Sequence, residues 1–140
     1  MAERSTTCSC GCGAVRFELS EPAALAGYCH CTRCQKRTGV GASAQARLAA
    51  GTTITVLSGE GLISCWRHPD GGAEKCFCSV CGSHLFSRDA GDRRVFAVRM
   101  SAFDGDPGVR PSFRQYVDYA AAWEPIPDDG LERHREGRPR

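Results

Sequence analysis

Short runs of alternating apolar and polar residues dominate the chain. In residues 14–19, AVRFEL, apolar side chains occupy every second position, so Val15, Phe17 and Leu19 would lie on one face of a strand. Glycine, proline and aspartate, which favour turns, separate this run from others like it. Further strand-like runs, rich in β-branched and aromatic residues, are 52–59, 61–68, 93–100 and 112–119. The pattern predicts a mainly β fold.

Helix signals are few, and the last ten residues are polar. Residues 31–39, CTRCQKRTG, predict one or two helical turns that end at the final glycine of this segment. The sequence PDGG at 69–72 lies between two strand-like runs and predicts a hairpin. Residues 131–140 are rich in Arg and Gly, which predicts a frayed tail. We therefore expect a single domain over residues 1–130, with its core in about 8–130.

Charge and hydropathy argue against two kinds of partner. The 18 basic and 16 acidic residues leave a net charge of +2, too small to indicate an obligatory nucleic-acid partner. No apolar run approaches the roughly 18 residues of a membrane span, and the opening MAERSTTCSC lacks the apolar segment of an export signal. We expect a cytoplasmic protein that binds neither nucleic acid nor membrane. The oligomeric state stays open.

Ten cysteines in 140 residues are the outlier of the composition. In a reducing compartment cysteines stay as thiols, and clustered thiols there indicate a metal. A disulfide within a C-x-C pair would also be strained, because its ring is too small for relaxed dihedral angles. The cysteines therefore predict metal sites rather than a disulfide framework.

Two pairs of cysteines have the spacing of a closed zinc site. A C-x-C pair in extended backbone directs both side chains to one face. A C-x-x-C-G sequence forms a tight turn whose glycine can take a positive φ. Two such pairs supply the four sulfurs of a tetrahedral structural zinc. We predict this zinc on Cys10, Cys12, Cys78 and Cys81, with Cys8 as an alternative to Cys10.

The sequence YCHCTRC at residues 28–34 supplies only three sulfurs. Catalytic zinc characteristically has three protein ligands and leaves the fourth position to water or substrate. This motif therefore predicts an open second zinc site on Cys29, Cys31 and Cys34. The alternative is a closed structural site, in which the fourth ligand would be Cys65, Cys76, His30 or His84. His30 is the weakest of these, because a residue between two ligands should point to the opposite face.

Positive charge surrounds the three-cysteine motif. Three thiolates on Zn²⁺ leave a net charge of about −1, which Arg33, Lys36 and Arg37 would offset while favouring deprotonated thiols. The same cations can meet the carboxylates of an acidic ligand. The motif thus predicts a small anionic thiol as the ligand, which as a thiolate would add to, or leave, a carbonyl compound.

Four motifs occur in a fixed order along the chain: CGCGAVRF at residues 10–17, CHCTRCQK at 29–36, FCSVCGS at 77–83 and WEPIPD at 123–128. Together they resemble the opening strand, the cysteine loop, the knuckle and the closing segment of the glutathione-dependent formaldehyde-activating family. This domain is also called the centromere-protein-V (CENP-V) domain and has the Mss4-like fold. The resemblance covers about residues 8–130.

The resemblance implies coiled antiparallel sheets that are stapled by zinc. It implies one structural zinc on the four cysteines predicted above and a second zinc on Cys29, Cys31 and Cys34. It also implies carbon–sulfur lyase chemistry, in which formaldehyde and glutathione condense to S-hydroxymethylglutathione or are released from it. Cys8, Cys65 and Cys76 depart from the family pattern, and the domain alone does not fix the substrate.

These observations lead to one preferred function and two alternatives. We predict a zinc-dependent carbon–sulfur lyase that acts on thiol–aldehyde adducts. A non-catalytic carrier of glutathione or another thiol, or a protein-binding module on the same scaffold, is the main alternative. A redox sensor that uses the extra cysteines is the third. The general acid or base is not assigned, and the candidates by residue type are His30, His84, Glu74 and Asp118.

Overall fold

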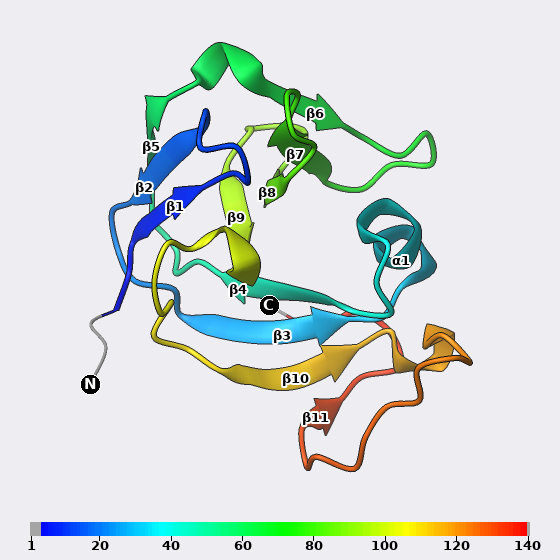
Figure 1. Cartoon of the computed structure of the whole chain (residues 1–140). Coiled ribbons are helices and arrows are strands. Elements are labelled where there is room, and N and C mark those ends of the chain that lie inside the picture. The colour runs from blue at the N-terminus through cyan, green and yellow to red at the C-terminus, as the bar shows by residue number, and fades with distance from the viewer. Residues whose placement is uncertain (1–3, 140) are drawn as a thin grey trace.

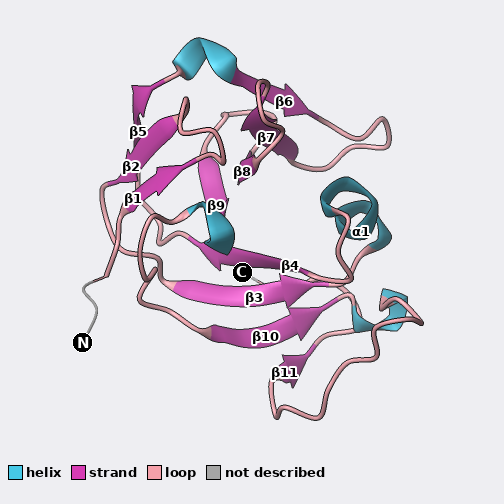
Figure 2. Ribbon diagram, viewed as in Figure 1, coloured by secondary structure: helices cyan, strands magenta, loops and turns pink. Residues whose placement is uncertain are grey.

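Two β-sheets and one short α-helix make up the computed structural model, which describes residues 4–139 (Figure 1, Figure 2). The smaller, antiparallel sheet has the order β1 (Thr7–Ser9), β2 (Arg16–Leu19), β5 (Ile54–Ser58). The larger sheet has the order β11 (Glu132–Arg133), β10 (Pro111–Gln115), β3 (Leu25–Cys29), β4 (Ser43–Arg47), β9 (Val95–Arg99), β8 (His84–Arg88), β7 (Glu74–Cys78), β6 (Ile63–Trp66). The prediction of a mainly β fold with little helix is confirmed.

The helical segments are short. The α-helix α1 spans Thr32–Thr38 and ends at Gly39, which has φ 75° and caps the helix as the sequence predicts. Three 3₁₀ turns are η1 (Glu60–Leu62), η2 (Met100–Ala102) and η3 (Val117–Tyr119). No helix within residues 4–139 has the length and apolar character needed to cross a membrane.

The hydrophobic core joins side chains from both sheets. On β2, Phe17 and Leu19 are buried whereas Arg16 and Glu18 are exposed, as the alternating pattern predicts. The ring of Phe17 meets the ring of Phe86 edge-on, with 5.4 Å between their centroids. Both sheets are therefore held to one apolar interior.

Strand β10 runs parallel to both β3 and β11, whereas the other strand pairs of the described chain are antiparallel. Gln115 at the end of β10 is paired with Cys29 at the end of β3, and the His30 amide donates to the carbonyl of Gln115 at 3.0 Å. Parallel strands end at the same edge of a sheet. The residues after β10 therefore lie beside the cysteine loop that follows β3.

A phenylalanine packs directly over a glycine where β10 meets β3. Phe113, which is buried, is paired with Gly27, and its ring occupies the space where a β-carbon on Gly27 would stand. The guanidinium groups of Arg47 and Arg138 lie 4.8 and 5.2 Å from the centroid of the same ring. Gly27 thus allows the close approach of two strands that carry the site.

The C-terminal part of the chain differs from its prediction. The run 112–119 does not form one strand, because Tyr116 takes a left-handed conformation and η3 follows it. Residues 131–139, expected to fray, instead contain β11, and the amide of Arg138 donates to the side-chain oxygen of Gln115 at 2.9 Å. Arg140 lies outside the described residues. Backbone pairing with β10, rather than burial of apolar residues, orders this polar segment.

The hairpin predicted around residues 69–72 is present and joins β6 to β7. Cys65 and Cys76 face each other across it and form a disulfide, with their Cα atoms 4.1 Å apart. This corrects the expectation that all ten cysteines stay as thiols. The register of the two strands brings these residues opposite each other. Their separation in the sequence does not by itself indicate a disulfide. Neither sulfur is then available as a zinc ligand.

Candidate functional site

The first cysteine cluster joins two similar turns. Gly13 follows the C-x-C pair and Gly82 follows the C-x-x-C pair, each with φ 79°. The amide of Gly82 donates to the carbonyl of Cys78 at 2.8 Å, which closes the second turn. The four sulfur atoms lie within 4.8 Å of one another. We name this set the four-thiol cluster: Cys10, Cys12, Cys78 and Cys81.

Hydrogen-bond donors favour the deprotonated form of two thiols of this cluster, Cys10 and Cys81. The amide of Val15 donates to Sγ of Cys10 at 3.2 Å. The hydroxyl of Ser83 lies 3.2 Å from Sγ of Cys81, and this contact and nearby backbone groups lower the pKa of the Cys81 thiol to about 5. Thiolates are the form in which cysteine binds zinc. The donor set and its surroundings therefore fit a zinc ion.

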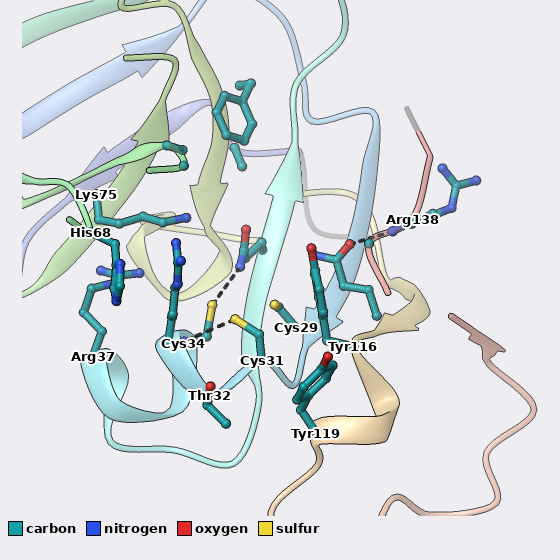
Figure 3. Close-up of a pocket in the computed structure, with 18 of the residues that line it drawn as sticks. Cys29, Cys31, Thr32, Cys34, Arg37, His68, Lys75, Tyr116, Tyr119 and Arg138 are labelled. Atoms are coloured by element: carbon teal, nitrogen blue, oxygen red, sulfur yellow. Dashed lines mark hydrogen bonds between the residues drawn. The ribbon is translucent and has the colours of Figure 1, made fainter. Parts of the chain in front are cut away.

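The second cluster forms where β3 leads into α1. Cys29 ends the strand, Cys31 is the N-cap of the helix, and Cys34 lies in the first helical turn. The amide of Cys34 donates to Sγ of Cys31 at 3.3 Å, so a capping contact fixes the loop. Figure 3 shows the three sulfurs grouped beside the helix, and they lie within 4.8 Å of one another. We name this set the three-thiol cluster.

The residues left open as a fourth ligand of this cluster are engaged elsewhere. Nε2 of His30 lies 3.1 Å from Nη1 of Arg114, and Nδ1 of His84 contacts Nη1 of Arg37. Cys65 and Cys76 are bonded to each other. Within residues 4–139, no further Cys, His, Asp or Glu ligand atom joins the three-thiol cluster. A metal held there would keep a coordination position free of protein side chains.

One buried and two half-buried cations lie near the three-thiol cluster: Arg99, Arg37 and Lys75. Arg99 is only 4% exposed, and burial and the charge of Arg99 lower the pKa of Arg37 to about 10 and also lower the pKa of Lys75. No carboxylate of residues 4–139 forms an ion pair with any of these three cations. Contacts with the two other thiols, and the charge of Arg99, hold the pKa of Cys34 well below its ordinary value. Arg99 thus helps to stabilise negative charge on the sulfur of Cys34.

The three-thiol cluster opens into a pocket of about 600 Å³. One wall comes from the hairpin of β6 and β7, and the opposite wall from the end of β10 and the C-terminal segment. The lining includes five cations and no Asp or Glu from the described chain: Arg33, Arg37, Arg47, Lys75 and Arg138. Trp66, Tyr116 and Tyr119 add aromatic surface. The pocket therefore suits a small anionic ligand with some apolar surface.

The cations predicted from sequence are only part of this lining. Arg33 and Arg37 line the pocket, whereas Lys36 lines an adjacent depression between α1 and the hairpin of β6 and β7. The other three cations of the lining, Arg47, Lys75 and Arg138, were not predicted as ligand-binding residues. The residues around them in the sequence do not indicate a binding site. The order of the strands and the path of the C-terminal segment bring these cations to the pocket.

None of the predicted acid–base candidates lines the pocket. Glu74 forms an ion pair with Arg88 at 3.2 Å, and Asp118 forms one with Arg135 at 2.7 Å. The two histidines are held by arginines, as described above. The acidic and histidine candidates are therefore better explained as structural residues, and the polar groups that reach the three-thiol cluster come from other residue types.

The fold and these two clusters define a class: a small, mainly β protein with one closed and one open cysteine site suited to zinc. Comparison with known proteins gives the family. The model of the family described as "glutathione-dependent formaldehyde-activating enzyme" matches residues 5–119, and the chain belongs to this family. The family predicted from the four sequence motifs is thus confirmed.

A solved structure shares the fold. The chain is similar to a Rhodobacter sphaeroides protein whose crystal structure was solved as a structural genomics target. The two are 23% identical, the similarity covers 91% of this chain and 98% of the other, and the TM-score is 0.54. At this identity the likeness concerns the fold alone.

Proposed function

We propose that the protein is a zinc-dependent carbon–sulfur lyase that makes and cleaves thiol–aldehyde adducts in the cytoplasm. Glutathione and formaldehyde are the substrates that family membership favours. The observation that carries this proposal is the three-thiol cluster. It lies at a cationic pocket, and no fourth ligand from the described chain closes it. Neither nucleic acid nor membrane is part of the proposed activity.

The two clusters have different roles in this proposal. The four-thiol cluster would hold a structural zinc that fastens the N-terminal segment to the turn after β7. The three-thiol cluster would hold the second zinc, which when bound supplies a Lewis acid that favours the thiolate form of a substrate thiol or polarises a carbonyl oxygen. The remaining chemistry depends on how the chain binds and orients the two substrates.

The pocket matches the charge of glutathione. Glutathione carries two carboxylates and one ammonium group, so that its thiolate form has a net charge of −2. Arg33 and Arg37, which line the pocket, would meet these carboxylates, and Lys75 and Arg138 extend the positive surface. Bidentate contacts from arginine would hold the peptide and so position its sulfur near the three-thiol cluster.

The reaction conserves atoms and needs no oxidant. The sulfur of the thiol attacks the carbonyl carbon of the aldehyde and forms a C–S bond. The electron pair of the C=O π bond moves to the oxygen, which then takes up a proton equivalent to the one that the thiol lost. The product is a hemithioacetal, S-hydroxymethylglutathione for this pair. Cleavage is the reverse, with loss of the hydroxyl proton and departure of the thiolate.

Zinc content and turnover together test the proposal. Elemental mass spectrometry should find two zinc ions per chain in the wild type and one in Cys34→Ser, with circular dichroism unchanged. NMR should show that the wild type accelerates exchange between glutathione, formaldehyde and their adduct, and that Cys34→Ser does not. Cys8→Ser is the matched control, because Cys8 is buried in the core outside both clusters and should keep both zinc ions.

Three outcomes would count against the proposal. A zinc-loaded wild type that fails to exceed the uncatalysed rate excludes the lyase. If calorimetry then still detects glutathione binding, the carrier function becomes the better explanation. Unfolding of Cys34→Ser, with Cys8→Ser still folded, would make the three-thiol cluster a structural site.

A further inference from the structure

A tyrosine beside the three-thiol cluster has a backbone conformation that tyrosine seldom adopts. Tyr116 has φ 56° and ψ 41°, the left-handed region in which its β-carbon is crowded. Two backbone hydrogen bonds hold it there: its amide donates to the carbonyl of Glu136 at 3.0 Å, and the amide of Tyr119 donates to its carbonyl at 3.1 Å. A bulky residue kept in this region points to a need for its side chain.

The left-handed turn directs this side chain into the pocket. Gln115, the preceding residue, is still paired with Cys29, so the turn occurs directly beside the three-thiol cluster. Figure 3 shows Tyr116 next to Cys29, and both residues line the pocket. The ordinary pKa of a tyrosine phenol is about 10, so a phenol is protonated at neutral pH and can donate a hydrogen bond.

The hydroxyl of Tyr116 is a donor without a partner. It forms no hydrogen bond with any residue in 4–139, whereas the hydroxyl of the neighbouring Tyr119 lies 3.5 Å from Oε1 of Glu136. A β-carbon on Gly137 would stand 3.2 Å from the Tyr116 hydroxyl, so the glycine leaves the ring just enough space. The C-terminal segment therefore fixes the phenol but leaves its proton free for a ligand.

Two other polar groups of the pocket are already engaged. Nζ of Lys75 donates to the hydroxyl of Ser87 at 3.2 Å, and the amide of Gln45 donates to the hydroxyl of Ser43 at 3.0 Å. The phenol of Tyr116, by contrast, is a neutral donor of the pocket that no group of the described chain occupies.

We infer that Tyr116 is a catalytic residue of the proposed reaction: its hydroxyl donates a hydrogen bond to the aldehyde oxygen while the C–S bond forms. This inference rests on the proposed function and names a role that the acid–base candidates do not fill. Negative charge grows on that oxygen as the C=O π bond opens, and a fixed donor stabilises it more in the transition state than in the substrate. The phenol keeps its own proton, and the oxygen receives through water the proton that the thiol released.

The experiment compares Tyr116→Phe with Tyr28→Phe, which also loses one hydroxyl but at a residue that does not line the pocket. Each variant is loaded with zinc, its metal content is measured, and adduct exchange is followed by NMR over a range of glutathione concentrations. Tyr116→Phe should lower kcat about 100-fold, the size of effect seen when one oxyanion donor is removed. KM, and the Kd for glutathione by calorimetry, should stay within about two-fold. Tyr28→Phe should leave both constants within about two-fold.

The outcomes separate the inference from the proposed function. A wild type that accelerates exchange, with Tyr116→Phe equally fast, overturns the role of Tyr116 and leaves the lyase in place. A rise in KM and Kd with kcat unchanged also overturns it, because the hydroxyl would then serve binding alone. Failure of the wild type to accelerate exchange overturns both. Equal urea unfolding midpoints for Tyr116→Phe and the wild type exclude loss of structure as the cause of a lower kcat.

Discussion

Replacing Gly27 by alanine should destabilise the protein by steric overlap alone. A β-carbon on Gly27 would stand 2.5 Å from Cε2 of Phe113 and closer still to two other ring atoms. Ordinary contacts between carbons are about 3.5–4.0 Å, so the ring would have to withdraw by roughly 1 Å. The backbone of Gly27 is not in the left-handed region, so the substitution adds no conformational strain of its own.

The expected loss of stability follows from the contacts of the Phe113 ring. Overpacking a dense interior costs about 1–3 kcal/mol. Displacement of the ring of Phe113 would also weaken its contacts with the guanidinium groups of Arg47 and Arg138, each worth about 0.5–1 kcal/mol. We therefore expect Gly27→Ala to lower the free energy of unfolding by about 3 kcal/mol. For a domain of this size that lowers Tm by about 10 °C.

Urea unfolding, followed by circular dichroism at constant m-value, measures this loss. Gly61→Ala is the matched control, because nothing lies within 4 Å of its new β-carbon, and it should stay within about 0.5 kcal/mol of the wild type. The double variant Gly27→Ala, Phe113→Leu should lose less than the sum of the two single losses, since leucine lacks the overlapping ring atoms. Equal stabilities of Gly27→Ala and Gly61→Ala, or strict additivity in the double variant, would refute the steric explanation.

Three further predictions concern other parts of the fold. Gly59→Ala should cost at least 2 kcal/mol by urea unfolding, because Gly59 has φ 75° and its new β-carbon would overlap a facing backbone carbonyl group. The double variant Cys65→Ser, Cys76→Ser should lose about 3 kcal/mol, the chain-entropy value for this short loop, and an unchanged midpoint would show that the disulfide does not stabilise the native state. The ion pair with Arg114 holds the pKa of Asp129 below 3.8, so the stabilisation from this pair is complete above pH 3.8 and is lost as the pH falls through the folded-state pKa. An NMR titration of the Asp129 carboxyl should give a midpoint below 3.8, and Arg114→Met should return it to the ordinary value.

The parts of the fold that depend on neighbouring residues could be predicted from the sequence. Alternation placed Phe17 and Leu19 in the core, and Gly39 marked the end of α1. The spacing of the cysteines also identified both clusters, because a C-x-C pair and a tight turn fix sulfur positions locally. These features need only a few residues of backbone and are therefore visible in a short window of sequence.

The parts that depend on strand order could not be predicted. The parallel pairing of β10 with β3 joins segments more than 80 positions apart in the sequence. The residues of the two strands do not indicate that these strands pair with each other. It brings Tyr116 to the three-thiol cluster, and tyrosine has no local preference for a left-handed turn. The disulfide between Cys65 and Cys76 likewise depends on the register of a hairpin. The shape and charge of the pocket thus depend on tertiary structure, whereas the grouping of its three sulfurs follows from local sequence.

The two cysteine clusters differ in how much polypeptide must exist before each can assemble. All three sulfurs of the three-thiol cluster come from residues 29–34, whereas the four-thiol cluster unites Cys12 with Cys78, 66 positions later. During synthesis on the ribosome, the first set emerges together and the second is complete only after residue 81 has left the exit tunnel. We therefore expect nascent chains to bind metal first at the three-thiol cluster, the site proposed for chemistry, and later at the four-thiol cluster. The structural zinc of the four-thiol cluster would then stabilise a chain whose three-thiol cluster already holds its metal.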